Sequence, residues 1–283
     1  MARFFTRLID AQAVWARPVG DFVHGIVHWL FHHMKPVHNF LNGTWLGHPL
    51  HPVLTDLPIG AFTVVILLDV LSFRDAANVT LGFGIVAMVA AAVAGYADYA
   101  DTDGTARWRA TVHSALMVVA LVIFIVSLVI RLGKPVDPTL GTATAIVAFL
   151  IMSASAYIGG DVVFALGNMV NRHAWRSRGT QWLALEAPAD IPEGVLTRAK
   201  AGTESLVLVR RGDTIMALHA TCAHAGGPLP EGRIVDGCIE CPWHGSRFDL
   251  QTGHLRRGPA NYDQPRYEVR RTSEGAWEAR RTV

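Results

Sequence analysis

Four stretches of this chain are each long and apolar enough to cross a lipid bilayer as a helix. They cover about residues 53–73, 79–99, 112–132 and 141–166, and the third carries no charged side chain between His113 and Arg131. A helix needs roughly 20 mostly apolar residues to span the hydrocarbon core of a membrane. Helices of water-soluble proteins seldom stay apolar on every face over that length. The sequence therefore predicts an α-helical bundle of four transmembrane spans.

The segment before these spans contains a shorter apolar stretch at 19–35, which histidines interrupt. Its large apolar side chains can share one helical face, with His24, His28 and His32 near the other. This pattern predicts an amphipathic helix that lies in the membrane interface instead of crossing it. The stretch lacks the small-residue cleavage site of a signal peptide, so we expect it to be retained.

Charged residues divide the chain into two parts. Residues 1–182 hold 22 charged side chains, residues 183–283 hold 26, and the first glutamate is Glu186. A net charge of +2 gives no reason to expect a nucleic-acid partner. We therefore predict four segments, which are an interfacial segment at 1–50, a transmembrane domain at 51–170, a basic linker at 171–182 and a second domain at 183–283.

Lysine and arginine near the spans predict the orientation in the membrane. With four crossings, one side receives Arg3, Arg7, Arg17, Lys35, Arg107, Arg109, Arg172, Arg176 and Arg178, and the other receives Arg74, Arg131 and Lys134. Basic residues concentrate on the cytoplasmic side of membrane proteins. We therefore expect a multi-pass protein of the bacterial inner membrane, in contact with lipid, with both termini and the second domain in the cytoplasm.

Polar residues of the spans gather toward that same side. The set is His48, His51, Asp56, Asp98 and His113. Both histidines of Gly47-His-Pro-Leu-His-Pro52 precede proline, which favours an extended backbone that would turn the two rings the same way. Polar groups inside membranes are costly and usually functional. Two interpretations stay open: a metal, haem b or quinone site, or a hydrogen-bonded polar cap in which, for example, His113 bonds to Asp98.

The stretch GHPLHPVLTDLPIGAF, at residues 47–62, resembles a bacterial four-helix membrane family of unknown function. The resemblance covers roughly residues 45–165. It implies a fold and no activity.

The second domain has short β-rich runs separated by turns. The runs 206–211 and 214–220 flank Gly212-Asp213, and two further runs flank Ser273-Glu274-Gly275. Such pairs are typical of β-hairpins. The sequence therefore predicts a small all-β domain after the helical bundle.

Two motifs of this domain carry metal-binding residue types. They are Cys222-Ala-His224 and Cys241-Pro-Trp-His244. Four such ligands around one atom would form a zinc site. Two thiolates on one iron and two imidazoles on another would hold a Rieske [2Fe–2S] cluster. The ligand pairs alone fit either metal site.

The surrounding residues resemble the Rieske pattern over residues 183–283, through CAHAGGPL, CPWHGSRFD and the TG-x-x-x-x-GPA stretch at 252–260. The resemblance implies that Cys222 and Cys241 bind the inner iron, that His224 and His244 bind the outer iron, and that Ser246 donates a hydrogen bond to a sulfide. High-potential members carry a disulfide where Gly227 and Trp243 stand here, and a tyrosine where Phe248 stands. We expect Cys238 to be a free thiol apart from the cluster.

Together these features predict a membrane-anchored electron-transfer protein or oxidoreductase component that exchanges electrons with a redox partner protein or a quinone. One alternative is a membrane quinone oxidoreductase with a second redox site, haem or quinone, in the bundle. Another is a redox sensor or assembly factor.

Overall fold

The computed structural model describes residues 2–133, 137–175, 179 and 181–282. Lys134, Arg176 and Arg178, which entered the orientation prediction, lie outside the described residues. The chain forms two compact units, of residues 1–41 with 49–168 and of residues 42–48 with 169–283. The short segments 42–48 and 169–175 therefore belong with the second unit. From the sequence, we expected 42–48 in the interfacial segment, 169–170 at the end of the transmembrane domain and 171–175 in the linker.

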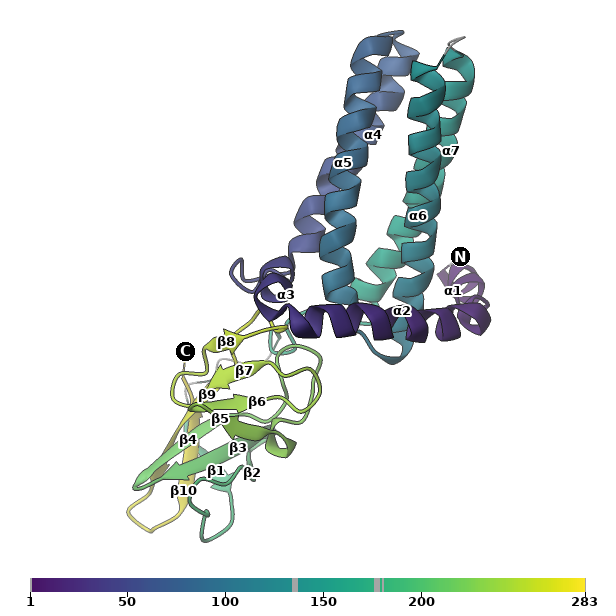
Figure 1. Ribbon diagram of the computed structural model, residues 1–283. Helices are drawn as coiled ribbons and strands as arrows, with labels where there is room; N and C mark the ends of the chain where they lie inside the picture. The colour runs from purple at the N-terminus through teal and green to yellow at the C-terminus, as the bar shows by residue number, and fades with distance from the viewer. Residues whose placement is uncertain (1, 134–136, 176–178, 180, 283) are drawn as a thin grey trace. The chain divides into compact units, whose positions relative to one another are not determined.

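Every regular element in the described part of the first unit is a helix (Figure 1). Three helices, α1 (Ala2–Asp10), α2 (Ala13–His33) and α3 (Lys35–Leu41), precede four long ones, α4 (Leu50–Val70), α5 (Arg74–Tyr99), α6 (Gly104–Leu132) and α7 (Pro138–Phe164). Each of the four long helices has the length and mean hydropathy that a membrane span requires. The prediction of four candidate spans is confirmed.

The four long helices form two hairpins, α4 with α5 and α6 with α7. Each helix packs more extensively against its hairpin partner than against the other hairpin. The two hairpins pack through α5 with α6 and α4 with α7. Side chains of α4 and α6 also meet between the hairpins, at paired positions that are 62 residues apart. At one end the rings of His51 and His113 lie 6.4 Å apart, and in the middle Phe62 stacks on Phe124 at 3.6 Å. At the other end Arg131 Nη1 donates to Asp69 Oδ1 at 2.7 Å. This repetition gives the bundle an approximate two-fold symmetry.

The start of α4 differs from the sequence prediction. His51 is the second residue of this helix, so only His48, outside the helix, keeps the non-helical backbone that the prolines favoured. Pro52 falls in the first turn of α4, where the backbone N–H that proline lacks would have no partner within the helix. The prediction that His48 and His51 share one extended repeat is therefore wrong.

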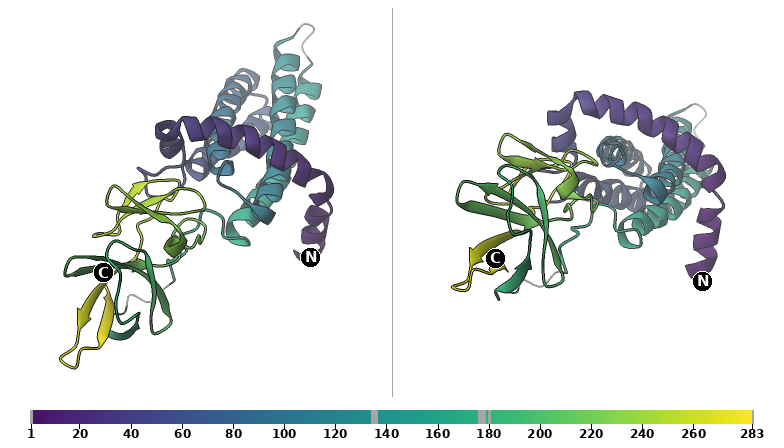
Figure 2. Two further views of the ribbon diagram at one scale, coloured as in Figure 1. Left: turned by 60° about the horizontal axis from the view of Figure 1, so that its bottom comes forward. Right: turned by 90° about the horizontal axis from the view of Figure 1, so that it is seen from below.

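Helix α2 crosses the end of the bundle where α5 ends and α6 begins (Figure 1 and Figure 2). His24 Nε2 and His28 Nδ1 donate hydrogen bonds to Ala100 O at 3.0 and 3.1 Å, and His38 Nε2 of α3 donates to Ala97 O at 3.0 Å. The last carbonyl groups of a helix have no donor within that helix. The histidine face of α2 therefore turns inward to cap α5, and apolar side chains such as Trp29 are exposed.

The second unit contains a closed six-stranded antiparallel barrel and a smaller four-stranded sheet. In spatial order the barrel strands are β1 (Leu183–Glu186), β10 (Trp277–Arg281), β9 (Arg266–Arg271), β4 (Thr214–His219), β3 (Glu204–Arg211) and β2 (Thr197–Ala201), and the sheet strands are β5 (Arg233–Val235), β6 (Cys238–Glu240), β7 (Arg247–Asp249) and β8 (Leu255–Arg257). The predicted hairpins are confirmed, since β3 pairs with β4 and β9 with β10. Gly212 has a φ of +58° in the first of these turns, which suits glycine.

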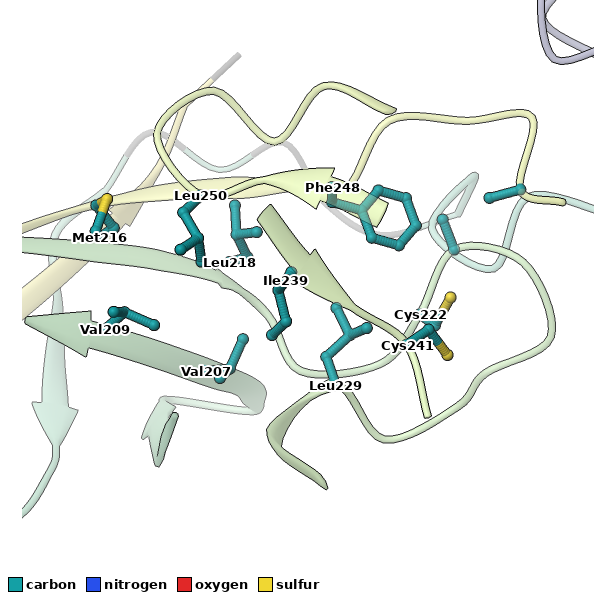
Figure 3. Packing of buried hydrophobic residues seen from close by; sticks show 12 residues of the cluster. Val207, Val209, Met216, Leu218, Cys222, Leu229, Ile239, Cys241, Phe248 and Leu250 are labelled. Carbon is teal, nitrogen blue, oxygen red and sulfur yellow. The ribbon is translucent and has the colours of Figure 1, made fainter. Parts of the chain in front are cut away.

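Strand β3 joins the two apolar cores of this unit, because both of its faces are buried. Leu206 and Leu208 point into the barrel core, and Val207 and Val209 point toward the small sheet. Figure 3 shows the core between β3 and the small sheet. It extends from Val209 and Met216 to Cys222 and Cys241 at its edge. The two cysteines are therefore held at the rim of a packed core.

Candidate metal centre

Two loops with the same backbone geometry carry the predicted ligands. The first loop, Cys222–Gly227, follows β4, and the second loop, Cys241–Ser246, follows β6. Cys222 N donates to Gly227 O at 2.8 Å, and Cys241 N donates to Ser246 O at the same distance. Gly226 and Gly245 occupy equivalent places with φ of +87° and +74°, which favour glycine. Each loop thus starts from a cysteine and carries a histidine, which is the third residue of the first loop and the fourth residue of the second.

The two cysteines lie next to each other and away from water. Cys222 is 1% exposed and Cys241 is 3% exposed, and Figure 3 shows their sulfur atoms side by side. A hydrogen bond from the Cys222 thiol lowers the pKa of Cys241 to about 7. The same bond, together with burial, raises the pKa of Cys222. Cys241 is therefore close to the thiolate form that binds metals.

The two histidines form a second pair. The rings of His224 and His244 lie 5.0 Å apart with an interplanar angle of 87°. His224 is buried, whereas His244 is partly exposed. The loops therefore bring the four predicted ligands together as one pair of sulfur atoms and one pair of imidazoles, with His244 as the member that solvent reaches.

Gly227 allows the first loop to approach the second. A Cβ at this position would lie 2.7 Å from Cys241 Sγ and 3.2 Å from the ring of Trp243. The first separation is too short for any side chain, so the close approach requires glycine. Trp243, which is about half exposed, packs against Gly227.

Gln264 fixes the first loop from a distant part of the chain and was not predicted from the sequence. Its Oε1 accepts from Ala223 N at 3.0 Å, and its Nε2 donates to His219 O and Thr221 O at 2.7 Å each. The side chain is 2% exposed. No local motif marks this residue, because its partners lie more than 40 positions away.

Ser246 connects the second loop to the TG-x-x-x-x-GPA stretch. Its Oγ accepts a hydrogen bond from Ala260 N at 3.0 Å, and the residue is fully buried. Since the oxygen accepts in this contact, the hydroxyl hydrogen is left to donate elsewhere. Phe248 is also fully buried and packs in the core of Figure 3. Cys238 is a free, buried cysteine whose Sγ donates to Asp236 O at 3.8 Å.

A group of arginines surrounds Glu240, the residue before Cys241. Arg233 Nη2 donates to Glu240 Oε1 at 2.6 Å, and Arg247 Nε donates to Oε2 at 2.5 Å. Burial opposes ionisation of this carboxyl, but the two arginines outweigh it and lower its pKa. A fixed negative charge, largely neutralised by its partners, therefore stands beside the second loop.

Residues 181–268 match the family described as "Rieske [2Fe-2S] domain". The anthranilate 1,2-dioxygenase ferredoxin subunit of Burkholderia cepacia is 32% identical over 90 residues, which are 32% of this chain and 83% of that protein. This chain belongs to the Rieske [2Fe–2S] family. Its Rieske domain is ferredoxin-like, carries out electron transfer and holds a [2Fe–2S] cluster, so the zinc alternative is set aside.

A second ferredoxin and a solved structure are also similar to the Rieske domain, and a second family model matches the helical part of the chain. Ferredoxin CarAc of Metapseudomonas resinovorans is 34% identical over 89 residues, which are 31% of this chain and 83% of that protein. A solved structure, described as a complex of reduced oxygenase and oxidized ferredoxin in carbazole 1,9a-dioxygenase, matches 37% of this chain and 99% of its own with 30% identity and a TM-score of 0.32. Residues 47–172 match "Predicted membrane protein (DUF2231)". The Rieske domain is therefore fused to a predicted membrane domain with four long apolar helices.

Among the described residues, the polar residues predicted in the bundle do not form a group of three or more that could hold a metal ion. Asp56 is exposed, Asp98 is buried near the end of α5, and His48 is assigned to the second unit. The rings of His51 and His113 are brought together. His113 Nδ1 bonds to Ser155 O at 2.9 Å, and not to Asp98 as the polar-cap interpretation suggested. The comparisons give no support for a haem, and the second site stays a prediction.

Proposed function

We propose that this protein is a membrane-anchored Rieske electron carrier whose cluster is held by Cys222, Cys241, His224 and His244. The observation that carries the assignment is the pair of matching loops, which join two buried sulfur atoms and two adjacent imidazoles. When bound, the cluster supplies one-electron transfer. The residues around it fit the group, since Gly227 leaves room beside Cys241 Sγ and the Ser246 hydroxyl has a hydrogen to donate.

The surroundings of the two pairs suit a carrier that meets a partner protein at one face. The cysteines face the apolar core, which keeps water from the sulfur atoms. His244 and Trp243 are the more exposed members of the site, and their rings lie 6.4 Å apart. We expect electrons to leave through the histidine side, where an imidazole N–H can donate a hydrogen bond to the partner.

Electron paramagnetic resonance of the reduced, detergent-solubilised protein tests the ligand assignment. We expect a Rieske signal with two irons and two acid-labile sulfides per chain. Replacing any of the four proposed ligands by alanine should remove the signal, whereas Cys238→Ala should retain it because this thiol lies apart from the pair. A full signal in any ligand variant, or its loss in Cys238→Ala, would contradict the assignment.

The basic residues around the spans support a cytoplasmic Rieske domain. Ion pairs involve basic residues on both sides, since Arg131 pairs with Asp69 and Arg109 pairs with Asp161. The support therefore comes from the larger number of basic residues on the side of the Rieske domain. Fusions at the C-terminus test the orientation. Green fluorescent protein should fluoresce there and alkaline phosphatase should be inactive, and the opposite pair of results would place the domain outside.

The names of its relatives suggest the kind of acceptor. Because several similar proteins are named as ferredoxin components of dioxygenases, we propose that an oxygenase component receives the electron from this protein. Stopped-flow mixing of the reduced protein with a Rieske-type oxygenase tests this, with fast reoxidation of the cluster as the expected result. Rapid reduction of the oxidised cluster by ubiquinol, with no reaction toward an oxygenase, would instead support the quinone oxidoreductase.

A further inference from the structure

His51 and His113 lie beside each other at one end of the bundle, each on the first helix of its hairpin. The ring centroids are 6.4 Å apart and the ring planes cross at 76°. Both side chains are half-buried. They occupy paired positions of α4 and α6, so the pair lies on the approximate two-fold axis that also relates Phe62 to Phe124.

The second helix of each hairpin holds its histidine in the same way. His51 Nδ1 lies 2.8 Å from Ala91 O, and His113 Nδ1 lies 2.9 Å from Ser155 O. A carbonyl oxygen only accepts hydrogen bonds, so Nδ1 carries the hydrogen in both rings and Nε2 of each neutral ring carries a lone pair. Within the described part of the chain, neither Nε2 has a hydrogen-bond partner.

A glycine makes room for each ring one helical turn beyond its acceptor. A Cβ at Gly95 would lie 2.9 Å from Cε1 of His51, and a Cβ at Gly159 would lie 3.0 Å from Cε1 of His113. Either side chain would force its ring to move. Histidine, backbone acceptor and glycine thus recur in both hairpins. Histidines that bind metals commonly donate their other ring N–H to a backbone carbonyl in this way, which fixes the tautomer and the ring orientation.

We propose that His51 and His113 bind one redox-active metal atom between them, which is the iron of a haem or a copper ion. Two imidazoles that bind one atom from opposite sides have centroids about 6 Å apart, because each metal–nitrogen bond is about 2 Å long. Imidazole suits iron and copper. Zinc requires about four ligands, and no third histidine, cysteine or carboxylate joins the pair among the described residues. The haem case would place the macrocycle between the two hairpins, where the helices pack less extensively.

Metal analysis of the purified full-length protein in detergent tests the proposal. The pyridine haemochrome spectrum measures haem, and atomic emission measures copper. The electron paramagnetic resonance signal of the reduced protein measures the Rieske cluster separately. We expect about one haem or one copper ion per chain, either as isolated or after incubation with hemin or Cu(I). Binding of neither, in protein that shows the full Rieske signal, would overturn the proposal and leave the proposed function standing.

Substitutions identify the ligands. His51→Ala and His113→Ala should each weaken binding of hemin or Cu(I) at least tenfold and leave the Rieske signal unchanged. His28→Ala is the matched control, since His28 also bonds a backbone carbonyl through Nδ1 but lies apart from the pair. His113→Met, which keeps a ligand atom, should retain the metal with a shifted absorption maximum. Unchanged binding in both alanine variants would overturn the assignment, as would a co-purifying quinone, without metal, that both variants lose.

Discussion

Single side chains decide how well the proposed ligands are positioned. The motif residues Cys222, His224, Cys241 and His244 could be predicted from the sequence, because each pair is close along the chain. Gln264 could not, since the residues that its amide contacts lie more than 40 positions away in the sequence. Sequence patterns therefore indicate which atoms can bind the cluster, but not which contacts keep the loops in place.

Replacing Gln264 by leucine should destabilise the first loop. The change leaves the buried Ala223 N–H without its acceptor and removes two donors to carbonyl groups. We expect a loss of about 2 to 4 kcal/mol in the stability of the Rieske domain. Thermal loss of the visible absorption of the cluster measures it. Gln251→Leu, an exposed position, serves as the control and should leave the transition unchanged; an equal loss in both variants would argue against this role of Gln264.

Ser246→Ala should lower the reduction potential of the cluster. The buried hydroxyl has a hydrogen to donate, and a hydrogen bond to the cluster favours its reduced, more negative state. Its loss corresponds to roughly 20 to 60 mV for one electron if the bond contributes about 0.5 to 1.5 kcal/mol. Titration monitored by electron paramagnetic resonance measures the shift. The exposed Ser273→Ala should show none, and an unchanged potential in Ser246→Ala would contradict the hydrogen bond.

At the scale of elements, the periodicity and length of the apolar stretches were sufficient to predict most helices and hairpins of the fold. The spans follow from apolar length, and the hairpins β3–β4 and β9–β10 follow from alternation around glycine-containing turns. The ends of the helices were harder to predict. Hydropathy does not indicate the residue at which α4 begins. The capping of α5 by His24 and His28 joins residues more than 70 positions apart, which no local pattern predicts.

The ion pair between α4 and α6 should be essential to the bundle. Asp69 and Arg131 are both nearly inaccessible, and Arg131 also donates to Gly141 O. Asp69→Leu leaves a buried guanidinium without a counter-charge, which we expect to cost about 3 to 5 kcal/mol. Thermal unfolding in detergent, followed by circular dichroism, measures the effect. The double variant Asp69→Leu/Arg131→Met should recover most of the loss, and a double variant as unstable as the single one would show that the charges were not the cause.

At the scale of the whole molecule, the two units should unfold separately. Each has its own packed core, one built from helices and the other from strands. Heating the full-length protein in detergent should therefore give two transitions, one in the visible absorption of the cluster and one in the helical circular dichroism signal. Removing the cluster with a chelator also removes the visible absorption, so the Rieske domain of the treated protein is followed by near-ultraviolet circular dichroism. Its transition temperature should fall by several degrees, and the helical transition should stay unchanged. A single transition that shifts as a whole would contradict this independence.

The composition of the chain predicted this division, because the charged residues concentrate after residue 182. The structure moves its limits, since 42–48 and 169–175 belong with the strands. Asn261 Nδ2 donates to Asn42 O at 2.5 Å, and Arg172 N donates to Ala223 O at 3.4 Å. These contacts join residues that no local pattern relates, so hydropathy alone could not have assigned the segments.

The approximate symmetry of the bundle does not extend to the charges of Asp69 and Arg131, and this difference restricts how hairpins can associate. Two copies of the α4–α5 hairpin facing each other would bring two Asp69 carboxylates together, and two copies of the α6–α7 hairpin would bring together two Arg131 guanidinium groups. Both arrangements bury like charges, which repel. Only the mixed arrangement pairs carboxylate with guanidinium. Pairing of two unlike hairpins is therefore favoured over pairing of two identical hairpins from neighbouring molecules.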